Sequence, residues 1–274
     1  MRYFITYGDK AYTRSAQRLT DEALHTQLFD KTHIFSPEEL PDSIRKHPLM
    51  QYRRGGGYWF WKPYVILTAL QEMNDGDILV YADAGCSIRP SEEWNTFFNI
   101  LKKKSILAFK LGFRNKFYTK RSALNYITRE EKYWSEYQQI AGGILLIRKT
   151  AESMQCISTW LQLMDTHPEL VTDVSENERK DEAPYFIEHR HDQCILSTSL
   201  FRYRHIVALR WENFEYLNPY EPQAFIASRI SDANPQNHRQ EISRFKYLKR
   251  KYIGRPLFSM RQQYWEWKSR HHKA

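Results

Sequence analysis

Asp83 is the residue whose position points most directly to chemistry. It follows an apolar run at residues 78–80, and residues 74–77 before that run form a turn signal. Ala84 and Gly85 come next, and both are too small to block a ligand. In open α/β sheets, ligands bind outside the carboxyl ends of strands, and an acid there commonly holds a divalent cation and, through it, a phosphate. The alternative is an aspartate that caps the turn after the strand.

A glycine-rich stretch, Arg53 to Pro63, is a second candidate site. Its three consecutive glycines, residues 55–57, allow a backbone to approach a ligand closely. We expect a helix directly after them, whose N-terminus favours anions, and Lys62 adds a positive charge there. Neither the P-loop spacing nor the dinucleotide fingerprint is present. The stretch predicts an anion-binding turn, or else a mobile loop before an aromatic helix that packs on the core.

Two histidines and an acid precede a helix that we expect at residues 192–200. His189 and His191 alternate on an extended segment, so they face the same side. Either could ligate a metal or hydrogen-bond a phosphate. Asp192 is a candidate general base, with a plain helix N-cap as the alternative.

Small residues also precede the strand expected at residues 144–147. Gly142 and Gly143 would let a substrate lie against the backbone. Gln139 offers both a donor and an acceptor, as a hydroxyl-rich substrate requires. A tight corner of the sheet is the other interpretation of the two glycines.

Hydrophobic periodicity places these motifs on an α/β body of about 230 residues. A strand at 3–7, a helix within 11–29 and a strand at 33–35 predict a β-α-β unit with parallel strands. Further strands are expected at 106–109 and 206–209, with a helix at 150–166. Two helical segments at 120–127 and 129–136 and a surface loop at 175–184 are also expected. Residues 1–230 would form the catalytic domain, and residues 231–274 a basic, aromatic tail.

Composition limits the class of protein. The 274 residues carry a net charge of +9, which predicts anionic partners such as nucleotide phosphates, an acidic membrane surface or nucleic acid. Three cysteines without C-x-x-C spacing indicate neither a disulfide framework nor a zinc site, and favour a reducing compartment. Neither a signal peptide nor a transmembrane segment is indicated, so we expect a cytoplasmic protein, soluble or peripheral.

Two other functions are compatible with this composition. A nucleic-acid-binding protein would explain the charge, but the basic residues concentrate in the tail and no standard motif is present, so we do not expect nucleic acid as a partner. A nucleotidyltransferase would use a similar sheet, but residues 8–10 after the first strand are too short for its usual phosphate loop.

The order of these motifs resembles that of GT-A glycosyltransferases. The combination RGGGYWFWKP, YADAG, QIAGGILL and HRHDQCILS, over roughly residues 1–215, is also similar to bacterial glycosyltransferases of capsule and lipopolysaccharide pathways. The resemblance implies a Rossmann-type mixed sheet flanked by helices, with a basic helical C-terminal tail. It implies sugar transfer from a nucleotide-sugar donor, with a UDP-sugar favoured, to a glycan or a lipid-linked glycan.

The resemblance also implies roles for individual residues. Donor binding is assigned to Thr6, Tyr7, Gly8, Lys62, Asp83, Ala84 and Gly85. Acceptor or sugar binding is assigned to Gln139, Gly142, Gly143, His189 and Gln193. Asp83 and Asp192 are the catalytic residues; Asp192 is the base of an inverting enzyme, or positions the sugar in a retaining one.

One departure from the family concerns the metal. Gly85 stands where the D-x-D motif has its second acid. We expect Mn²⁺ or Mg²⁺ held by Asp83, His191 and the donor diphosphate. The alternative is transfer without metal, in which Lys62 and arginines neutralise the diphosphate.

The tail mixes cations with aromatic residues at 245–253 and again at 264–268. Aromatic rings favour the membrane interface, and Lys and Arg are attracted to an anionic leaflet. We therefore expect residues 241–274 to hold the protein on the cytoplasmic face of the inner membrane, near a lipid-linked acceptor. The other interpretation is a solvated basic helix packed on the body.

Overall fold

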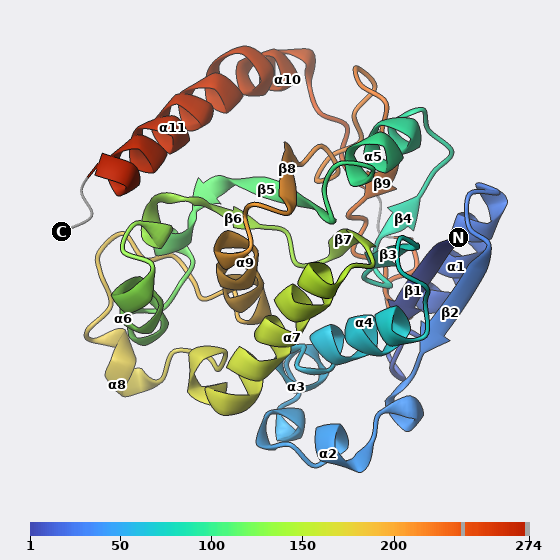
Figure 1. Cartoon of the computed structure of the whole chain (residues 1–274), viewed down its shortest axis with the longest axis horizontal. Coiled ribbons are helices and arrows are strands. Elements are labelled where there is room, and N and C mark those ends of the chain that lie inside the picture. Colours follow the sequence, from blue (N-terminus) through green and yellow to red (C-terminus); the bar gives the residue numbers. More distant parts are fainter. Residues whose placement is uncertain (237–238, 272–274) are drawn as a thin grey trace.

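A seven-stranded sheet runs through the body of the protein (Figure 1). The computed structural model describes residues 1–236 and 239–271. The strands of this sheet are β1 Arg2–Tyr7, β2 Lys31–Phe35, β3 Ile78–Ala82, β5 Ile106–Arg114, β6 Gln138–Ile140, β7 Ile144–Arg148 and β8 Val207–Trp211. Their order is β2-β1-β3-β7-β5-β6, and β8 pairs with the other edge of β5. Two short strands, β4 Ser87–Ile88 and β9 Phe225–Ile226, form a separate pair.

The sheet is mixed, because β7 runs against its neighbours. β1 is parallel to both β2 and β3, which confirms the expected β-α-β unit. β7 is antiparallel to β3 and to β5, whereas β8 is parallel to β5. Because β3 and β7 are antiparallel, the start of β7 lies beside the end of β3. The site described below lies at that junction.

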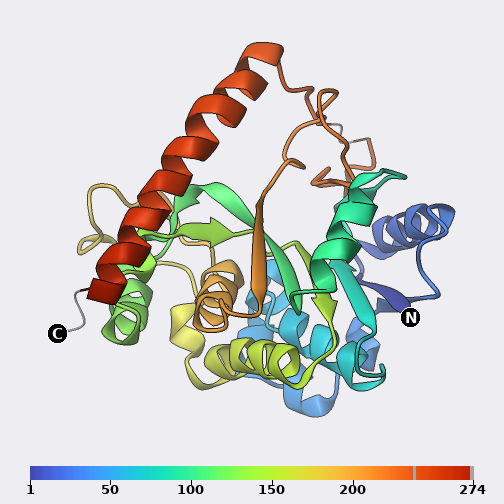
Figure 2. The same ribbon diagram turned by 45° about the horizontal axis from the view of Figure 1, so that its top comes forward.

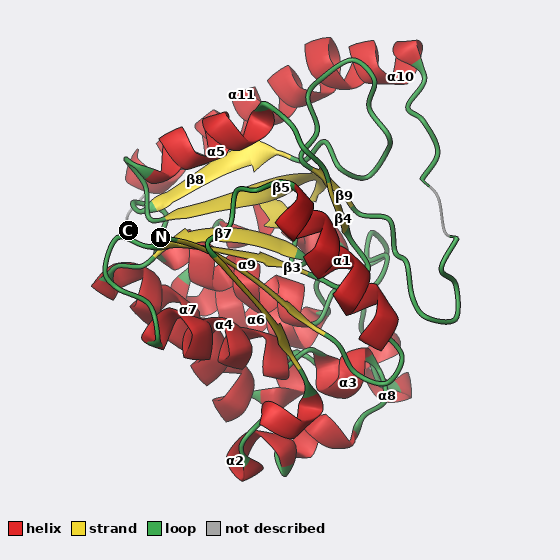
Figure 3. Cartoon of the chain, turned by 90° about the vertical axis from the view of Figure 1, so that its right-hand side faces the viewer, coloured by secondary structure: helices red, strands yellow, loops and turns green. Residues whose placement is uncertain are grey.

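Helices cover both faces of the sheet (Figure 3). The longer ones are α1 Thr13–His25, α4 Trp61–Gln71, α5 Glu93–Leu101, α6 Arg121–Glu130, α7 Ala151–Thr166, α9 Asp192–Arg202 and α11 Arg255–His271. The shorter ones are α2 Asp42–Arg45, α3 Gly55–Tyr58, α8 Glu176–Arg179 and α10 Arg244–Lys249. Alternating side chains of β1 enter two cores, because successive residues of a strand face opposite sides. Ile5 packs with α4, α7 and α9, and Phe4 packs with α1 and α5.

Local structure differs from expectation in two places. Two helical segments were expected at 120–127 and 129–136, but α6 runs on to Glu130 and the second segment is reduced to a 3₁₀ turn at Trp134–Glu136. The segment expected as a loop at 175–184 contains the short helix α8, which Ser175 caps through a hydrogen bond from the Glu178 amide. At α8 the side-chain cap of Ser175 supports the helix, and hydrophobic periodicity does not report such a cap.

The glycine-rich stretch forms a left-handed turn. Five consecutive residues from Gly55 to Trp59 have φ values of 59°, 56°, 100°, 51° and 59°. Left-handed backbone costs an L-residue about 1–2 kcal/mol, and glycine tolerates it. Gly57 also lies so close to its surroundings that a Cβ would come within 2.8 Å of Met50 Cα. The three glycines therefore make this turn possible, and it leads into α4.

Residues 244–271 form a C-terminal arm made of α10, a π-helix at Arg250–Gly254 and α11. Figure 2 shows α11 standing along the outer side of the sheet, beyond β8. Its far half reaches the turn after α6, where the rings of Trp265 and Tyr133 lie 5.5 Å apart between centroids. In the described part of the chain, we find no helix with the length and apolar character needed to cross a bilayer.

Candidate active site

A cleft of about 920 Å³ opens at the carboxyl ends of β1 and β3. Tyr7 and Asp9 line it at the end of β1, and Asp83 lines it at the end of β3. Gly142 and Gly143, which lead into β7, form part of its wall. The arm contributes the opposite wall through Lys246, Arg250, Gly254, Arg255 and Phe258.

Backbone pairing fixes Asp83 beside Gly143. Asp83 is the next residue after β3, and its amide donates to the carbonyl oxygen of Gly143 at 2.8 Å, which continues the ladder between β3 and β7. The Asp83 carboxylate turns back over the same glycine, so that a Cβ on Gly143 would lie 2.8 Å from Asp83 Oδ2. Gly143 is thus required for the close approach of this carboxylate.

A buried lysine joins two carboxylates behind this wall. Nζ of Lys62 lies 3.0 Å from Oδ1 of Asp83 and 3.5 Å from Oδ2 of Asp192. It also donates to the carbonyl oxygen of Gly142 at 3.2 Å. The Lys62 side chain is only 3% exposed, whereas that of Asp83 is 36% exposed. Burial lowers the pKa of Lys62, but Asp83 and Asp192 together raise it by more, so this pKa lies above its usual value.

Tyr81 gives Asp83 a second donor from within β3. The Tyr81 hydroxyl donates to Asp83 Oδ1 at 2.6 Å, and the tyrosine is fully buried. Burial and the adjacent Asp83 charge raise the pKa of Tyr81 well above its usual value, so it stays a donor. One oxygen of Asp83 is therefore held by Tyr81 and Lys62, which presets the direction of the carboxylate.

Asp192 begins α9 and lies on the buried side of the cleft wall. Its side chain is 7% exposed, and Oδ2 would be 3.6 Å from a Cβ on Gly142. Burial raises the pKa of Asp192 to about 7, with Lys62 opposing that rise and Asp83 adding to it. A carboxyl group with this pKa can exchange a proton near neutral pH.

Two glutamines, Gln139 and Gln193, link the start of α9 to the glycines of the cleft wall. Gln193 lines the cleft, and its Oε1 accepts from the Gly142 amide at 3.1 Å. Its Nε2 donates to Gln139 Oε1 at 2.5 Å. Gln139 is fully buried and donates to the Tyr118 carbonyl oxygen at 3.2 Å. Gln139 therefore positions Gln193 and does not itself line the cleft.

Aromatic and cationic side chains line the end of the cleft near β1. The rings of Tyr7 and Trp61 stack with centroids 3.7 Å apart, and both line the cleft. Tyr12 is 38% exposed and Asp9 lies next to it. Arg53 is exposed at the rim beside the left-handed turn, and its side chain makes no hydrogen bond or ion pair within residues 1–236 and 239–271. Such a surface suits a flat ring joined to an anionic group.

Most of the residues expected from the sequence either line the cleft or lie behind its wall. Those that line the cleft are Tyr7, Asp83, Ala84, Gly85, Gly142, Gly143 and Gln193. Lys62 and Asp192 lie directly behind it. Thr6 is fully buried and donates to the Ala82 carbonyl oxygen at 2.8 Å, and Gly8 packs against Ala16, 2.8 Å from where its Cβ would lie. Both of these support the β1 end of the cleft from behind.

The two histidines lie away from Asp83. His189 Nε2 donates to the Leu170 carbonyl oxygen at 2.9 Å, and its Nδ1 accepts from the Lys120 amide at 3.3 Å. Burial lowers the pKa of His189 well below its usual value, so the ring is neutral. His191 Nδ1 donates to the Val171 carbonyl oxygen at 2.8 Å. Neither histidine lines the cleft.

The residues expected to hold a metal therefore do not fit that role together. Asp83 faces the cleft, but the Lys62 ammonium already lies against its Oδ1, and His191 Nε2 is directed toward Asp173 Oδ1 at 3.6 Å. No group of three or more His, Cys, Asp or Glu in the described part of the chain is arranged to hold a metal ion.

Several cleft residues were not expected from the sequence. Asp9 and Tyr12 follow β1, so the rule that ligands bind beyond strand ends identifies them in retrospect. No local pattern marks the others, which reach the cleft only through tertiary packing: Arg190, Trp211, Arg229, Lys246, Arg250, Arg255 and Phe258.

Comparison with known proteins gives structural neighbours only, since no protein-family model and no curated protein sequence matches the chain. Mouse xyloside xylosyltransferase 1 is 13% identical, with a TM-score of 0.42 over 80% of this chain and 87% of its own. Galactosyltransferase LgtC, solved with donor and acceptor sugar analogues, is 14% identical, with a TM-score of 0.41 over 95% of each chain. Glycosyltransferase GlyE of Streptococcus pneumoniae TIGR4 is 14% identical, with a TM-score of 0.46 over 98% of this chain and 64% of its own.

These three neighbours are glycosyltransferases, the class that the sequence motifs resemble. Identities of 13–14% and TM-scores below 0.5 do not establish a family, so the function rests on the geometry of the site.

Proposed function

We propose that the protein is a GT-A-type glycosyltransferase that uses a nucleotide-sugar donor. The observation that carries the proposal is the buried Lys62 ammonium between Asp83 and Asp192, directly behind the glycine wall of a large cleft. A partly exposed carboxylate at the end of β3 and a buried one with a raised pKa at the start of α9 suit the transfer of a sugar to a hydroxyl.

The cleft provides separate surfaces for the parts of such a donor. Tyr12 and Asp9 would receive the base, and Arg53 would bind the diphosphate by charge-assisted hydrogen bonds. The sugar would then lie over Gly142 and Gly143, where the absence of side chains leaves room beside Asp83. We favour a UDP-linked donor because of the motif order described above.

The proposed reaction breaks the bond between the sugar and the diphosphate and forms a bond to an acceptor oxygen. The nucleoside diphosphate leaves with the bonding electrons, and the acceptor hydroxyl loses its proton. Asp83 would orient the donor sugar. Asp192 would take the proton, since its pKa is near 7 and its Oδ2 lies 3.6 Å from the position of a Cβ on Gly142, a residue of the cleft wall.

The acceptor would be a glycan or a lipid-linked glycan of bacterial surface polysaccharide synthesis. This assignment rests on the sequence resemblance and on the volume of the cleft, about 920 Å³, between the strand ends and the arm. No step of the proposed mechanism passes through a metal ion, because Asp83 and His191 do not converge.

The test is a thermal-shift panel of nucleotide sugars, each with and without Mn²⁺, followed by transfer assays on the donor that binds. A ligand at 100 times its Kd should stabilise the protein by about 2.7 kcal/mol. Asp83→Asn should abolish transfer. The matched control is Asp75→Asn, which changes an exposed aspartate in the turn before β3. If no nucleotide sugar binds, and nucleic acid binds with a steep dependence on salt, the proposal is wrong.

A further inference from the structure

The outer side of the C-terminal arm is apolar and exposed. We call the following residues the outer stripe: Phe245, Leu248, Tyr252, Leu257, Met260, Tyr264 and Trp267. Their exposed fractions run from 39% for Leu248 to 77% for Phe245. Exposed apolar side chains gathered along one face of a helix mark an interaction surface. Of its four aromatic residues, Tyr252, Tyr264 and Trp267 are of the two types, Tyr and Trp, that concentrate at membrane interfaces.

The π-helix keeps this stripe on one side of the arm. Residues three or four apart share a face of an α-helix, and the stripe follows that spacing up to Tyr252 and again from Leu257. Tyr252 and Leu257 are five apart, and Ile253, which is 55% exposed, lies between them within the π-helix. The π-helix at Arg250–Gly254 has i→i+5 hydrogen bonds and so absorbs one extra residue at this point. Pro256 lies just beyond it and has no amide hydrogen to bond the preceding turn.

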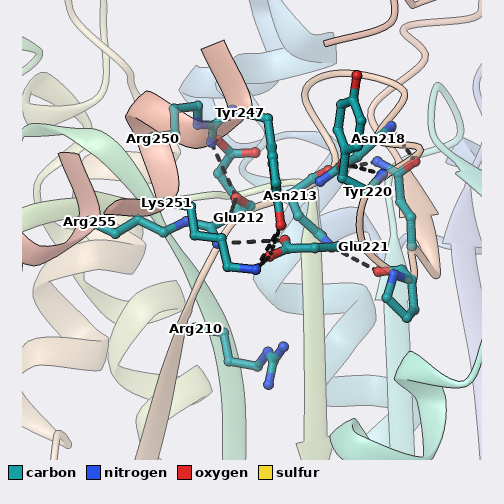
Figure 4. Close-up of polar contacts among 12 residues, drawn as sticks. Arg210, Glu212, Asn213, Asn218, Tyr220, Glu221, Tyr247, Arg250, Lys251 and Arg255 are labelled. Carbon is teal, nitrogen blue, oxygen red and sulfur yellow. Dashed lines mark hydrogen bonds and ion pairs between the residues drawn. The ribbon is translucent and has the colours of Figure 1, made fainter. Parts of the chain in front are cut away.

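The inner side of the arm is fixed to the body by polar contacts (Figure 4). Arg250 forms an ion pair with Glu212, which is only 4% exposed. The Glu221 carboxylate contacts three residues of the arm. The Tyr247 hydroxyl donates to its Oε1 at 3.1 Å, Lys251 Nζ lies 3.4 Å from Oε1, and Arg255 Nη1 lies 3.6 Å from Oε2. Turning the outer stripe inward would break all of these contacts and leave Glu212 buried without its cation.

Charge on the arm suits an anionic surface. Residues 241–271 contain nine Lys or Arg and two Glu, a difference of +7, against +9 for the whole chain. Arg244, Lys249 and Arg261 are exposed, and their side chains make no ion pair within the described ranges. These cations lie on the same helices as the outer stripe, as they do in helices that bind in the plane of a bilayer.

We propose that the outer stripe docks on an anionic lipid leaflet with the arm lying flat in the interface. The apolar side chains would enter the boundary between head groups and acyl chains, and the cations would contact lipid phosphates. Because the inner side of the same arm is a wall of the cleft, docking would place the cleft beside the leaflet. If the function proposed above holds, this geometry favours a lipid-borne acceptor, and that second step rests on the proposed function.

Vesicle sedimentation with the full chain tests the docking. The protein should sediment with phosphatidylcholine vesicles that contain phosphatidylglycerol, and much less with phosphatidylcholine alone. The double variant Leu257→Ser/Met260→Ser should bind at least about tenfold more weakly, since it removes two side chains that would be buried in lipid. The matched control, Leu24→Ser on α1, removes a leucine that is 52% exposed, against 60% for Leu257, and should bind like the wild type.

A charge variant and the oligomeric state complete the test. Lys249→Glu/Arg261→Glu should also weaken binding to anionic vesicles, and added salt should weaken binding by the wild type. Circular dichroism and thermal unfolding should show that every variant folds. Equal sedimentation of the stripe variant and the Leu24→Ser control would overturn the proposal. A dimer that the stripe variant converts to monomer, without lipid binding by the wild type, would assign the stripe to a second copy of the chain and also overturn it.

Sedimentation does not depend on sugar transfer. A protein that binds vesicles but transfers no sugar would contradict the proposed function and leave the docking intact. A protein that transfers sugar to a soluble acceptor but does not bind vesicles would contradict the docking and leave the proposed function intact.

Discussion

The ammonium of Lys62 lies 3.0 Å from Oδ1 of Asp83, and the lysine is almost completely buried while the aspartate opens to the cleft. The pair therefore connects the interior of the protein with its candidate active site. Asp192, 3.5 Å from the same ammonium, completes a charge cluster of one cation between two carboxylates. Buried clusters of this kind cost stability when one member is removed, because the remaining charges lose their partner.

Replacing the buried lysine should affect stability and turnover together. Lys62→Met leaves two carboxylates close to each other without a cation, so we expect unfolding free energy to fall by about 3 kcal/mol and transfer to be lost. From the sequence alone, a Lys62 substitution would mainly weaken donor binding. The burial of Lys62 instead predicts the larger effect on stability. Urea unfolding measures the change in unfolding free energy, and Lys103→Met, at an exposed lysine, is the control. If Lys62→Met is as stable as the wild type, the buried charge cluster does not contribute to stability as described.

Asp192 should make the protein less stable as the pH rises toward neutrality. Its pKa is about 7 in the folded protein, against about 3.9 for an unperturbed aspartate. Between these values the folded state holds a proton that the unfolded state has released, so stability falls from about pH 4 to about pH 7 and then levels off. Thermal unfolding across this range should show the fall in the wild type and a smaller one in Asp192→Asn.

The same group should give a rising pH–rate profile. If Asp192 accepts the proton of the acceptor hydroxyl, turnover increases as it ionises, through about pH 7, and reaches a plateau above it. Asp192→Asn should lower turnover more than donor affinity, because the amide keeps the shape but cannot accept the proton. An unchanged profile in this variant would remove Asp192 from the catalytic residues.

A methyl group at Gly143 should displace Asp83. The Cβ of Gly143→Ala would lie 2.8 Å from Asp83 Oδ2, so the carboxylate must move away from Lys62 and Tyr81. We expect a large loss of turnover with a stability loss of about 1–3 kcal/mol. Gly112→Ala adds the same methyl group to another part of the cleft, where nothing lies within 4 Å, and should leave both quantities close to wild type.

The left-handed turn should tolerate one alanine better than another. Gly57→Ala combines a φ of 100° with a Cβ 2.8 Å from Met50 Cα. Gly56→Ala has a φ of 56° and no contact closer than 3.5 Å. The Gly56 variant should lose about 1–2 kcal/mol of unfolding free energy, and the Gly57 variant clearly more. The order of the two urea midpoints is the check, and the reverse order would contradict the described turn.

Arg53 should act in binding rather than in folding. Its exposed side chain lines the cleft without a partner among the described residues, so Arg53→Ala should leave the melting temperature unchanged. Loss of a charge-assisted hydrogen bond to the diphosphate should weaken nucleotide-sugar binding by about tenfold or more. Arg89→Ala, another exposed arginine away from the cleft, is the control for a change in net charge; equal affinity in both variants would place the diphosphate elsewhere.

The sequence by itself determined the elements that carry the site. Strand β3, the helix after the glycine stretch and α9 were all expected, and Asp83 lies at the strand end as predicted. Each of these depends on patterns within a few residues: an apolar run that ends in a turn signal, glycines before a helix, an aspartate before apolar periodicity. The α/β class followed from the same patterns, whereas the mixed sheet was implied by the resemblance to GT-A glycosyltransferases, and both are confirmed.

Only the tertiary structure decided which of these residues meet. Because β7 runs antiparallel to β3, Gly143 meets Asp83, and the turn into α9 then brings Asp192 to the other side of Lys62. His189 and His191 do face the same side, as their alternation predicted, with ring centroids 5.0 Å apart. The same packing, however, directs both rings to backbone carbonyl groups and away from the cleft. Strand direction and the docking of the arm through Glu212 and Glu221 depend on contacts between residues far apart in the chain, and no local pattern encodes them.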